Sequence, residues 1–349
     1  MGFLFSKKRK DGQLVDAADP MLSIMPYMMR SRVEAQVSYT FSIRLDTINA
    51  FIREKRREGK RITFFHVIIS ALLKMIGERP HLNRFVAGRR VYQHDDFDIL
   101  YVVKPDLTDE SNESVARVRF EEDDTIFEVA DRMTVQTEAI QNATELKGDD
   151  KLIRWVLRLP RWLLRTVFAV YRWMDFHGMV PKVLLDLLPF YSSIFVSHLG
   201  TVGGDSAIHH LYEMGTCSIF AVIGKQYEKA ERNDDDSINW VKTIDVSVTV
   251  DERICDGYYF VKSLKLMERY LRDPWLLEYP GINIPIKRTE EFQAFRDRER
   301  ERAAERRANE EAAQRELIEE IVKQALKEHK STLGIDELLA TLRELEQSK

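Results

Sequence analysis

Alternating apolar and polar positions predict strands in this chain, and apolar positions spaced three or four residues apart predict helices. The alternating or β-branched stretches are residues 36–45, 90–92, 97–104, 115–120, 193–198, 218–224 and 243–250. The helical stretches are residues 46–57, 63–78, 124–142 and 260–272. Strands and helices that follow one another in this way indicate one mixed α/β domain of roughly 260 residues.

Two segments lie outside this pattern. Residues 1–20 include the basic run Lys7-Lys8-Arg9-Lys10 and offer little to bury, so we expect a flexible basic arm. From residue 286 to 349 the composition shifts to Arg, Glu, Ala and Gln, which predicts a charged helical extension whose last part regains an apolar stripe. Between them we expect a domain at 21–285 with a helical insertion at 146–190.

Composition excludes several classes of protein. The chain has 349 residues, 44% of them apolar and 32% charged, with a net charge of -4, which is typical of a globular protein without a field that would attract nucleic acid. Cys217 and Cys255 are far apart, so neither a disulfide framework nor a metal site is indicated. We find no apolar run long enough to span a bilayer and expect a cytoplasmic protein.

The segment Asp251-Glu252-Arg253-Ile254-Cys255-Asp256-Gly257 lies between a predicted strand and a predicted helix. Four other segments accompany it, namely Ile62-Thr63-Phe64, Glu78-Arg79-Pro80-His81-Leu82-Asn83, Phe195-Val196-Ser197-His198-Leu199-Gly200 and Ala221-Val222-Ile223-Gly224. Together, in this order, they resemble the catalytic domain of the dihydrolipoamide acyltransferases of 2-oxo acid dehydrogenase complexes. More distantly they resemble chloramphenicol acetyltransferase. The resemblance covers about residues 21–275.

This resemblance implies a fold, an assembly and a substrate. The fold would be a chloramphenicol acetyltransferase-like two-layer α/β (α+β) sandwich with a mixed sheet. The assembly would be a homotrimer whose active sites lie between subunits. The substrate would be CoA in its acylated form, or another thioester, with no covalently bound cofactor.

The family motif is His-x-x-x-Asp-Gly, and Glu252 stands at the position of its catalytic His. By resemblance, Asp256 is the structural Asp that pairs with an upstream arginine, here Arg30 or Arg32, and Gly257 completes the motif. Ser197 corresponds to a hydroxyl that stabilises the tetrahedral oxyanion. The domains that serve a dehydrogenase complex would precede this one, and only about 20 residues do so here, which argues against a standard role in such a core.

Three interpretations of Glu252 remain open. In the first, Glu252 is the general base, which requires apolar surroundings because an ordinary carboxylate is a poor base for a thiol. In the second, the base is His198, His209 or His210. In the third, the chain is a catalytically inactive trimeric scaffold that binds a partner or a membrane surface. We expect acyl transfer from a thioester to a thiol or hydroxyl, with the scaffold as the alternative.

An arginine and tryptophan segment occupies residues 151–190. At about 100° per residue, one stripe of a helix holds Arg154, Arg158, Arg161, Arg165 and Arg172, and Trp155, Trp162 and Trp173 flank it. We expect Pro160 to kink or split this helix, and the stripe, which stays in phase across it, favours a kink. The order of cation, tryptophan and aliphatic residues fits a helix in a membrane interface. It also fits a helix docked on the domain with its arginines in water, or the lid of an acyl-chain tunnel.

The amino terminus supports the membrane interpretation. Met1-Gly2-Phe3-Leu4-Phe5-Ser6 has the form of a myristoylation signal, and the basic run at residues 7–10 follows it. Even without a lipid, three apolar residues beside four cations would give weak affinity for an anionic surface. Peripheral membrane contact is therefore an expectation beside a cytoplasmic location.

Overall fold

The computed structural model describes residues 9–15, 20–103, 114–121, 123–141, 156–232 and 237–280, together with Ala308, Ala312 and Arg315. Contacts divide the chain into two units, Met1–Ile284 and Pro285–Lys349. In the second unit the three described residues are helical and exposed. The rest of the predicted extension at 286–349 lies outside the described residues.

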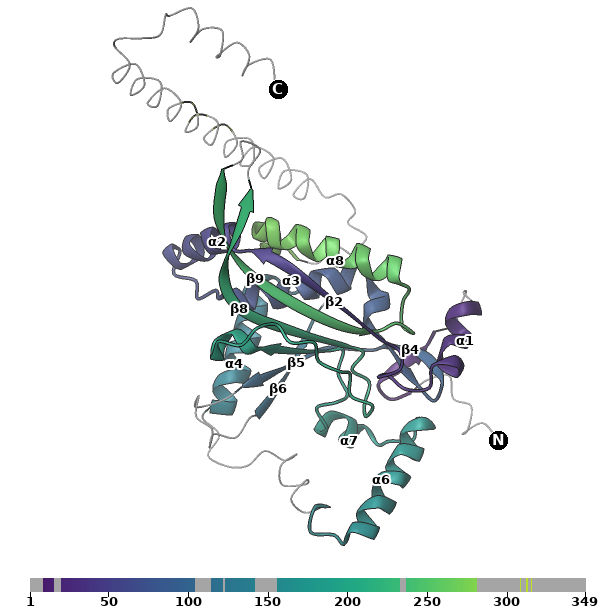
Figure 1. Ribbon diagram of the computed structural model, residues 1–349. Coiled ribbons are helices and arrows are strands. Elements are labelled where there is room, and N and C mark those ends of the chain that lie inside the picture. Colours follow the sequence, from purple (N-terminus) through teal and green to yellow (C-terminus); the bar gives the residue numbers. More distant parts are fainter. Residues whose placement is uncertain are drawn as a thin grey trace, which may run out of the picture. The chain divides into compact units, whose positions relative to one another are not determined.

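A six-stranded mixed sheet forms the centre of the first unit (Figure 1). Its order is β2 (Gln36–Arg44), β9 (Ile238–Asp251), β8 (Ile219–Arg232), β7 (Ile194–His198), β5 (Phe97–Val103) and β6 (Ser114–Phe120). β7 runs parallel to both β5 and β8, and the other neighbours are antiparallel. The expected mixed α/β fold is confirmed.

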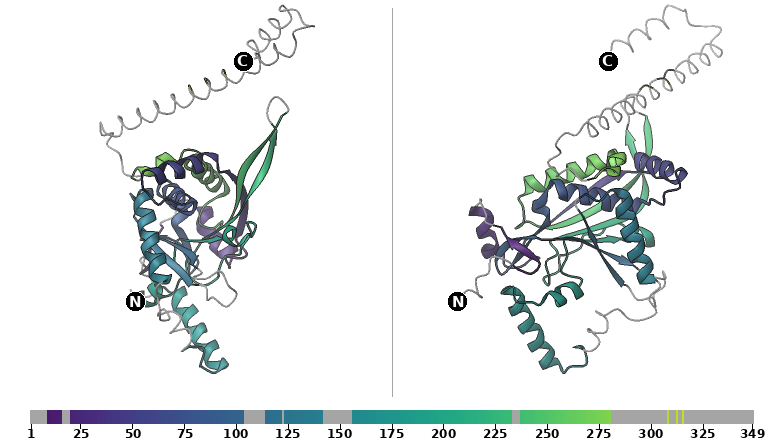
Figure 2. Two further views of the ribbon diagram at one scale, coloured as in Figure 1. Left: turned by 90° about the vertical axis from the view of Figure 1, so that its left-hand side faces the viewer. Right: turned by 180° about the vertical axis from the view of Figure 1, so that it is seen from behind.

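Four helices cover one face of this sheet (Figure 2). They are α2 (Asp46–Arg57), α3 (Phe64–Glu78), α4 (Ile126–Gln141) and α8 (Gly257–Arg272). Every residue of α3 from Val67 to Ile76 is buried, because the other helices pack around it. Thr63 caps α3 by accepting a hydrogen bond from the His66 N–H at 3.3 Å. The result is the two-layer arrangement that the resemblance to the acyltransferases implied.

The opposite face of the sheet has two parts. In the middle, Leu100, Phe195, Phe220 and Val222 form a second apolar cluster, which Leu211 and Cys217 complete. Toward the edge strand β2, hydrogen-bonded hydroxyl pairs replace apolar contacts. The Ser38 and Thr249 hydroxyl oxygens are 3.0 Å apart, and those of Thr40 and Ser247 are 2.8 Å apart.

A second, three-stranded sheet corrects the expectation of a flexible arm. It consists of β1 (Gly12–Leu14), β4 (Arg90–His94) and β3 (Arg84–Ala87), with helix α1 (Pro20–Met28) following β1. Arg9 is buried and lies 5.6 Å from the Phe85 ring and 5.7 Å from the Tyr92 ring. Residues 9–15 are therefore part of the fold, because distant residues supply their contacts.

The helical insertion contains α6 (Arg161–Phe176) and α7 (Lys182–Leu187). Pro160 is the N-cap of α6, so the predicted kink within a longer helix is wrong at this position. Short 3-10 turns complete the unit at Pro80–Asn83, Leu199–Val202 and Pro274–Glu278. Across the described part of the chain, no helix combines the length and apolar character needed to cross a membrane.

Candidate active site

Glu252 lies directly beyond the last residue of β9, and neighbours on both sides fix its main chain. The Asp251 N–H donates to the Ser218 carbonyl at 3.0 Å, and the Glu252 N–H donates to the Ala35 carbonyl at 2.9 Å. The Glu252 side chain is half-buried. Its backbone is therefore positioned as firmly as that of a residue within the sheet.

A buried ion pair encloses this turn. Arg253 donates to Asp251 from Nε to Oδ1 at 2.8 Å and from Nη2 to Oδ2 at 2.7 Å. Asp251 is 0% exposed and Arg253 is 3% exposed. Arg253 also donates to the Met29 carbonyl at 3.0 Å. A bidentate pair of this kind fixes geometry, because neither charge can remain buried without its partner.

Arg32 belongs to the same cluster. Its Nε lies 3.8 Å from Asp251 Oδ2, and its other nitrogens donate to the carbonyls of Tyr212, Glu213 and Val86. Burial lowers the pKa of the Arg32 guanidinium, and Asp251 opposes that shift. Arg32, not the exposed Arg30, therefore reaches the motif. Its carboxylate partner is Asp251, so the expected pairing with Asp256 is wrong.

Asp256 instead caps α8. It is exposed, and its Oδ1 accepts a hydrogen bond from the Tyr259 N–H at 2.7 Å. A Cβ atom added at Gly257 would meet nothing within 4 Å, so packing within one chain does not require glycine there. Burial raises the pKa of the Cys255 thiol to about 12, which suits a core residue and not a nucleophile.

Ser197 and His198 point to opposite faces of the sheet, because neighbours on a strand alternate. His198 lies on the helix face, stacked on Phe65 with ring centroids 5.8 Å apart, and burial lowers its pKa. Ser197 shares the other face with Phe195. The two side chains therefore cannot act on one bound molecule from a common side, although the sequence places them next to each other.

Strand register separates Ser197 from Glu252 within one chain. Ser197 pairs with Val222, and Val222 pairs with Ser247 on β9. Glu252 lies five residues beyond Ser247, which corresponds to roughly 17 Å along the strand and about 10 Å across two strand spacings. One copy of the chain does not bring these two groups together.

His209 shares the face of Ser197. Its ring stacks on the ring of Phe220 with centroids 3.9 Å apart, and Phe220 lies opposite Phe195 on the neighbouring strand. His209 Nδ1 is 2.6 Å from the His210 carbonyl oxygen. His210 is exposed, whereas His209 is half-buried. Of the three histidines considered as bases, only His209 is enclosed on this side.

One histidine near the motif was missed by sequence reasoning. The His81 ring stacks on the Tyr259 ring with centroids 4.4 Å apart, and the main-chain N–H of His81 donates to Tyr259 Oη at 3.3 Å. Burial lowers the pKa of His81, Arg84 lowers it further, and Asp256 opposes both. The available signal was its place in the Glu78 to Asn83 segment, which already carried part of the resemblance.

The arginine and tryptophan residues lie apart from this turn in sequence and on a separate helix. Arg154 and Trp155 fall outside the described residues. Arg158 precedes α6, and Arg161, Trp162, Arg165, Arg172 and Trp173 belong to it; all six are exposed.

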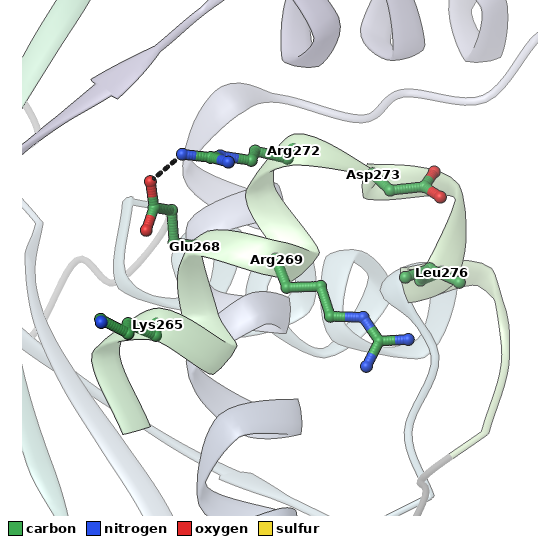
Figure 3. Close-up of a pocket in the computed structure, with 6 residues that line it drawn as sticks. All are labelled: Lys265, Glu268, Arg269, Arg272, Asp273 and Leu276. Atoms are coloured by element: carbon green, nitrogen blue, oxygen red, sulfur yellow. Dashed lines mark hydrogen bonds and ion pairs between the residues drawn. The ribbon is translucent and has the colours of Figure 1, made fainter. Parts of the chain in front are cut away.

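The described cavities do not coincide with the motif. One of 350 Å³ lies at the far end of α8 and is lined by Lys265, Glu268, Arg269, Arg272, Asp273 and Leu276 (Figure 3). Another of 640 Å³ includes Asn83, Asp95, Asp96 and Arg119 in its lining. Glu252, Asp256 and Ser197 line neither. Among the residues that the structure describes, no cluster of His, Cys, Asp or Glu could hold a metal ion.

Comparison with known proteins adds a family match. Residues 191–279 match the model of the 2-oxoacid dehydrogenases acyltransferase (catalytic domain) family, a stretch that includes both Ser197 and the Asp251 to Gly257 motif. No curated protein matches the sequence.

Three solved structures illustrate the similarity. A probable dihydrolipoamide acetyltransferase from Listeria monocytogenes is 13% identical, with 74% of this chain and 94% of that chain covered and a TM-score of 0.47. The Azotobacter vinelandii dihydrolipoamide acetyltransferase is 13% identical, with 74% and 88% covered and a TM-score of 0.49. A chloramphenicol acetyltransferase is 15% identical, with 74% and 99% covered and a TM-score of 0.43. The resemblance inferred from the sequence is thus confirmed by the family model over residues 191–279, which are similar to the catalytic domain of the 2-oxoacid dehydrogenase acyltransferases.

Proposed function

We propose that this protein transfers an acyl group from acyl-CoA or another thioester to a thiol or hydroxyl, with Glu252 as general base. The observation that carries the proposal is the fixed turn around Glu252. Hydrogen bonds to Ala35 and Ser218 and the buried pair of Asp251 and Arg253 hold it in place. Such enclosure of a loop carboxylate supports a positioned group rather than a solvated surface residue.

The chemistry needs one proton carrier. Glu252 takes the proton from the acceptor thiol or hydroxyl, whose sulfur or oxygen then attacks the thioester carbonyl carbon. The tetrahedral intermediate collapses, the carbon–sulfur bond to CoA breaks, and the departing thiolate receives the proton from Glu252. Ser197 donates a hydrogen bond to the oxyanion. A carboxylate performs this task best where water is excluded, and Glu252 is half-buried before any partner covers it.

We further propose that two copies of the chain form each site. The register keeps Ser197 and Glu252 well apart within one chain, so a site that uses both needs Glu252 of one subunit and Ser197 of its neighbour. A ring of three subunits satisfies this head-to-tail relation and closes. A homotrimer is also what the resemblance to the acyltransferase family implies.

The first test changes Glu252 alone. Purified protein is incubated with acetyl-CoA and a dithiol acceptor, and released CoA is measured by chromatography. We expect Glu252→Gln to lose at least a hundredfold in rate. Glu252→His restores the base type of the family motif, and its rate should rise near pH 6.5 as the imidazole loses its proton. Glu228→Gln, at an exposed position on β8, is the matched control.

The outcomes separate the alternatives. Full activity in Glu252→Gln, with loss in His209→Gln, would assign the base to His209. No turnover in the wild type, together with no acetyl-CoA binding by calorimetry, would instead favour the inactive scaffold.

A second test addresses the shared site. Ser197→Ala and Glu252→Gln chains are co-expressed with different tags, and the mixed assembly is isolated. The isolated mixed trimers should regain about a third of wild-type activity, because one of the three sites in each combines an intact Glu252 with an intact Ser197. Activity no higher than in either variant alone would contradict a site built from two copies.

A further inference from the structure

We infer that α6 docks on an anionic lipid surface, a role that does not depend on acyl transfer. The helix spans Arg161–Phe176, and none of its residues is buried. Its large apolar side chains face solvent instead: Trp162 is 68% exposed and Trp173 is 53% exposed. The other exposed large apolar residues of the helix are Val167, Phe168, Val170 and Phe176.

Two different faces can be distinguished on α6. Its half-buried residues are Leu163, Leu164, Tyr171, Met174 and Asp175. At about 100° per residue these side chains share one side of the helix. Arg161, Arg165 and Arg172 lie within about 40° of one another outside that side, with the two tryptophans next to them. The outward face therefore carries a row of cations beside a pair of indole rings.

Contacts hold this orientation in place. Tyr171 Oη and Tyr191 Oη are 2.5 Å apart, and Tyr171 and Met174 pack on a small cluster formed by Val180, Leu185 and Tyr191. Arg9 donates to the Asp175 carbonyl at 2.6 Å and to Asp175 Oδ1 at 2.8 Å. The inward face of α6 is thus already occupied. Its outward face is the one left for a partner, and in Figure 1 α6 lies apart from α2, α3 and α8.

Charge identifies an anionic occupant. The exposed ionisable residues of α6 are all arginines, because Asp175, its single carboxylate, is half-buried and held by Arg9. Two copies that paired through this face would bring like charges together. A bilayer containing anionic lipid accepts both features, since its headgroups attract arginine and its interfacial zone favours tryptophan.

The amino terminus adds a second observation from another part of the chain. Arg9 lies against Asp175, at the carboxyl end of α6. The residues that precede Arg9 in sequence include Lys7 and Lys8 and the apolar run Phe3-Leu4-Phe5. In sequence, the second segment with membrane-binding composition therefore directly precedes a residue that is bound to α6. Peripheral proteins reach stable binding by combining two weak membrane signals.

The test uses flotation of the full chain with two kinds of vesicle. One is phosphatidylcholine alone, and the other is three parts phosphatidylcholine to one part phosphatidylglycerol. We expect flotation only with the anionic vesicles, and its loss at high salt. Replacing Arg161, Arg165 and Arg172 by Gln should weaken binding roughly a hundredfold, because each cation near an anionic surface contributes about fivefold.

Matched variants keep the test specific. Trp162→Ala with Trp173→Ala should also release the protein, whereas Trp240→Ala, at a position 64% exposed on β9, should not. The control for the loss of charge replaces three exposed arginines of α2 by Gln, namely Arg53, Arg56 and Arg57. Circular dichroism checks that every variant is folded.

Three results would overturn the inference. The first is absence of flotation with anionic vesicles, and the second is equal loss in the control variants. The third is a change of oligomeric state in the Trp162 and Trp173 variant, seen by sedimentation velocity without vesicles, which would assign the face to a second copy. Neither flotation nor sedimentation velocity measures acyl transfer, so a negative result here would not contradict the proposed activity.

Discussion

Arg253 holds both oxygens of the Asp251 carboxylate, and the two residues stand on either side of Glu252. The buried pair therefore controls a turn whose middle residue remains half-exposed. Arg32 adds a second guanidinium 3.8 Å from the same carboxylate. The position of the proposed base thus depends on a charge cluster that takes no part in the reaction itself.

Removing Arg253 should destabilise the protein strongly. Arg253→Ala leaves the Asp251 charge buried without its bidentate partner, and we expect a loss of about 3–5 kcal/mol in the free energy of unfolding. Urea denaturation followed by circular dichroism measures it. Arg272→Ala breaks an exposed ion pair with Glu268 and should cost less than about 1 kcal/mol. Equal losses in the two variants would contradict the role of the buried pair.

The protein should tolerate loss of the Asp256 charge, but not loss of the side-chain oxygen that caps α8. Asparagine can accept the hydrogen bond from the Tyr259 N–H as aspartate does, so Asp256→Asn should stay close to wild type. Asp256→Ala should lose about 1 kcal/mol in the free energy of unfolding. If the Asn variant is as unstable as the Ala variant, an ion pair of Asp256 is needed and the capping role is insufficient.

His94 should make the protein sensitive to acid. Burial lowers its pKa to about 4, with Asp11 and Asp98 opposing the shift and Arg117 adding to it. Since the unfolded chain takes up this proton near pH 6.5 and the folded chain near pH 4, stability is full above 6.5 and falls as the pH drops toward 4.

The measurement compares unfolding free energies of wild type and His94→Gln across this range. The wild type should fall more steeply, by at most about 1.4 kcal/mol per pH unit, the limit for one proton. Parallel curves would show that another group causes the loss.

Both thiols should resist modification in the folded protein. Cys217 and Cys255 are each 3% exposed, and burial raises the pKa of both. Ellman's reagent should therefore react with neither until denaturant is added, when two thiols per chain should appear. Rapid reaction of either one under native conditions would mean that its part of the core opens.

Local patterns were sufficient for the main sheet and its helices. The alternation at residues 36–45 and the apolar stripe at 63–78 became β2 and α3 almost residue for residue. The periodic sequence indicates the type of each element directly. It does not give the burial, because only Ile43 of β2 is buried, whereas α3 is buried on all sides from Val67 to Ile76. β8 and β9 are longer than predicted because their outer halves pair with each other while remaining exposed, so hydrophobic pattern gives no sign of them.

Contacts between distant residues could not be predicted in the same way. β1 exists because Gly12 to Leu14 pair with β4 and because Arg9 finds aromatic rings and Asp175, none of which is near it in sequence. The motif likewise suggested Asp256 as the partner of an arginine. Folding instead buried Asp251 beside Arg32 and Arg253 and left Asp256 at a helix end.

The arrangement around Ser197 could be predicted in part from the sequence. Strand alternation alone separates the faces of Ser197 and His198. The distance between Ser197 and Glu252 required the order of the strands and their register, which two short motifs do not contain.

The tie between Arg9 and Asp175 also has a practical consequence for protein engineering. A shortened chain that lacks Arg9 would leave Asp175 without its guanidinium partner, so the carboxyl end of α6 would lose an anchor. The flotation and activity measurements should therefore use the full chain, with any affinity tag attached after the carboxyl terminus.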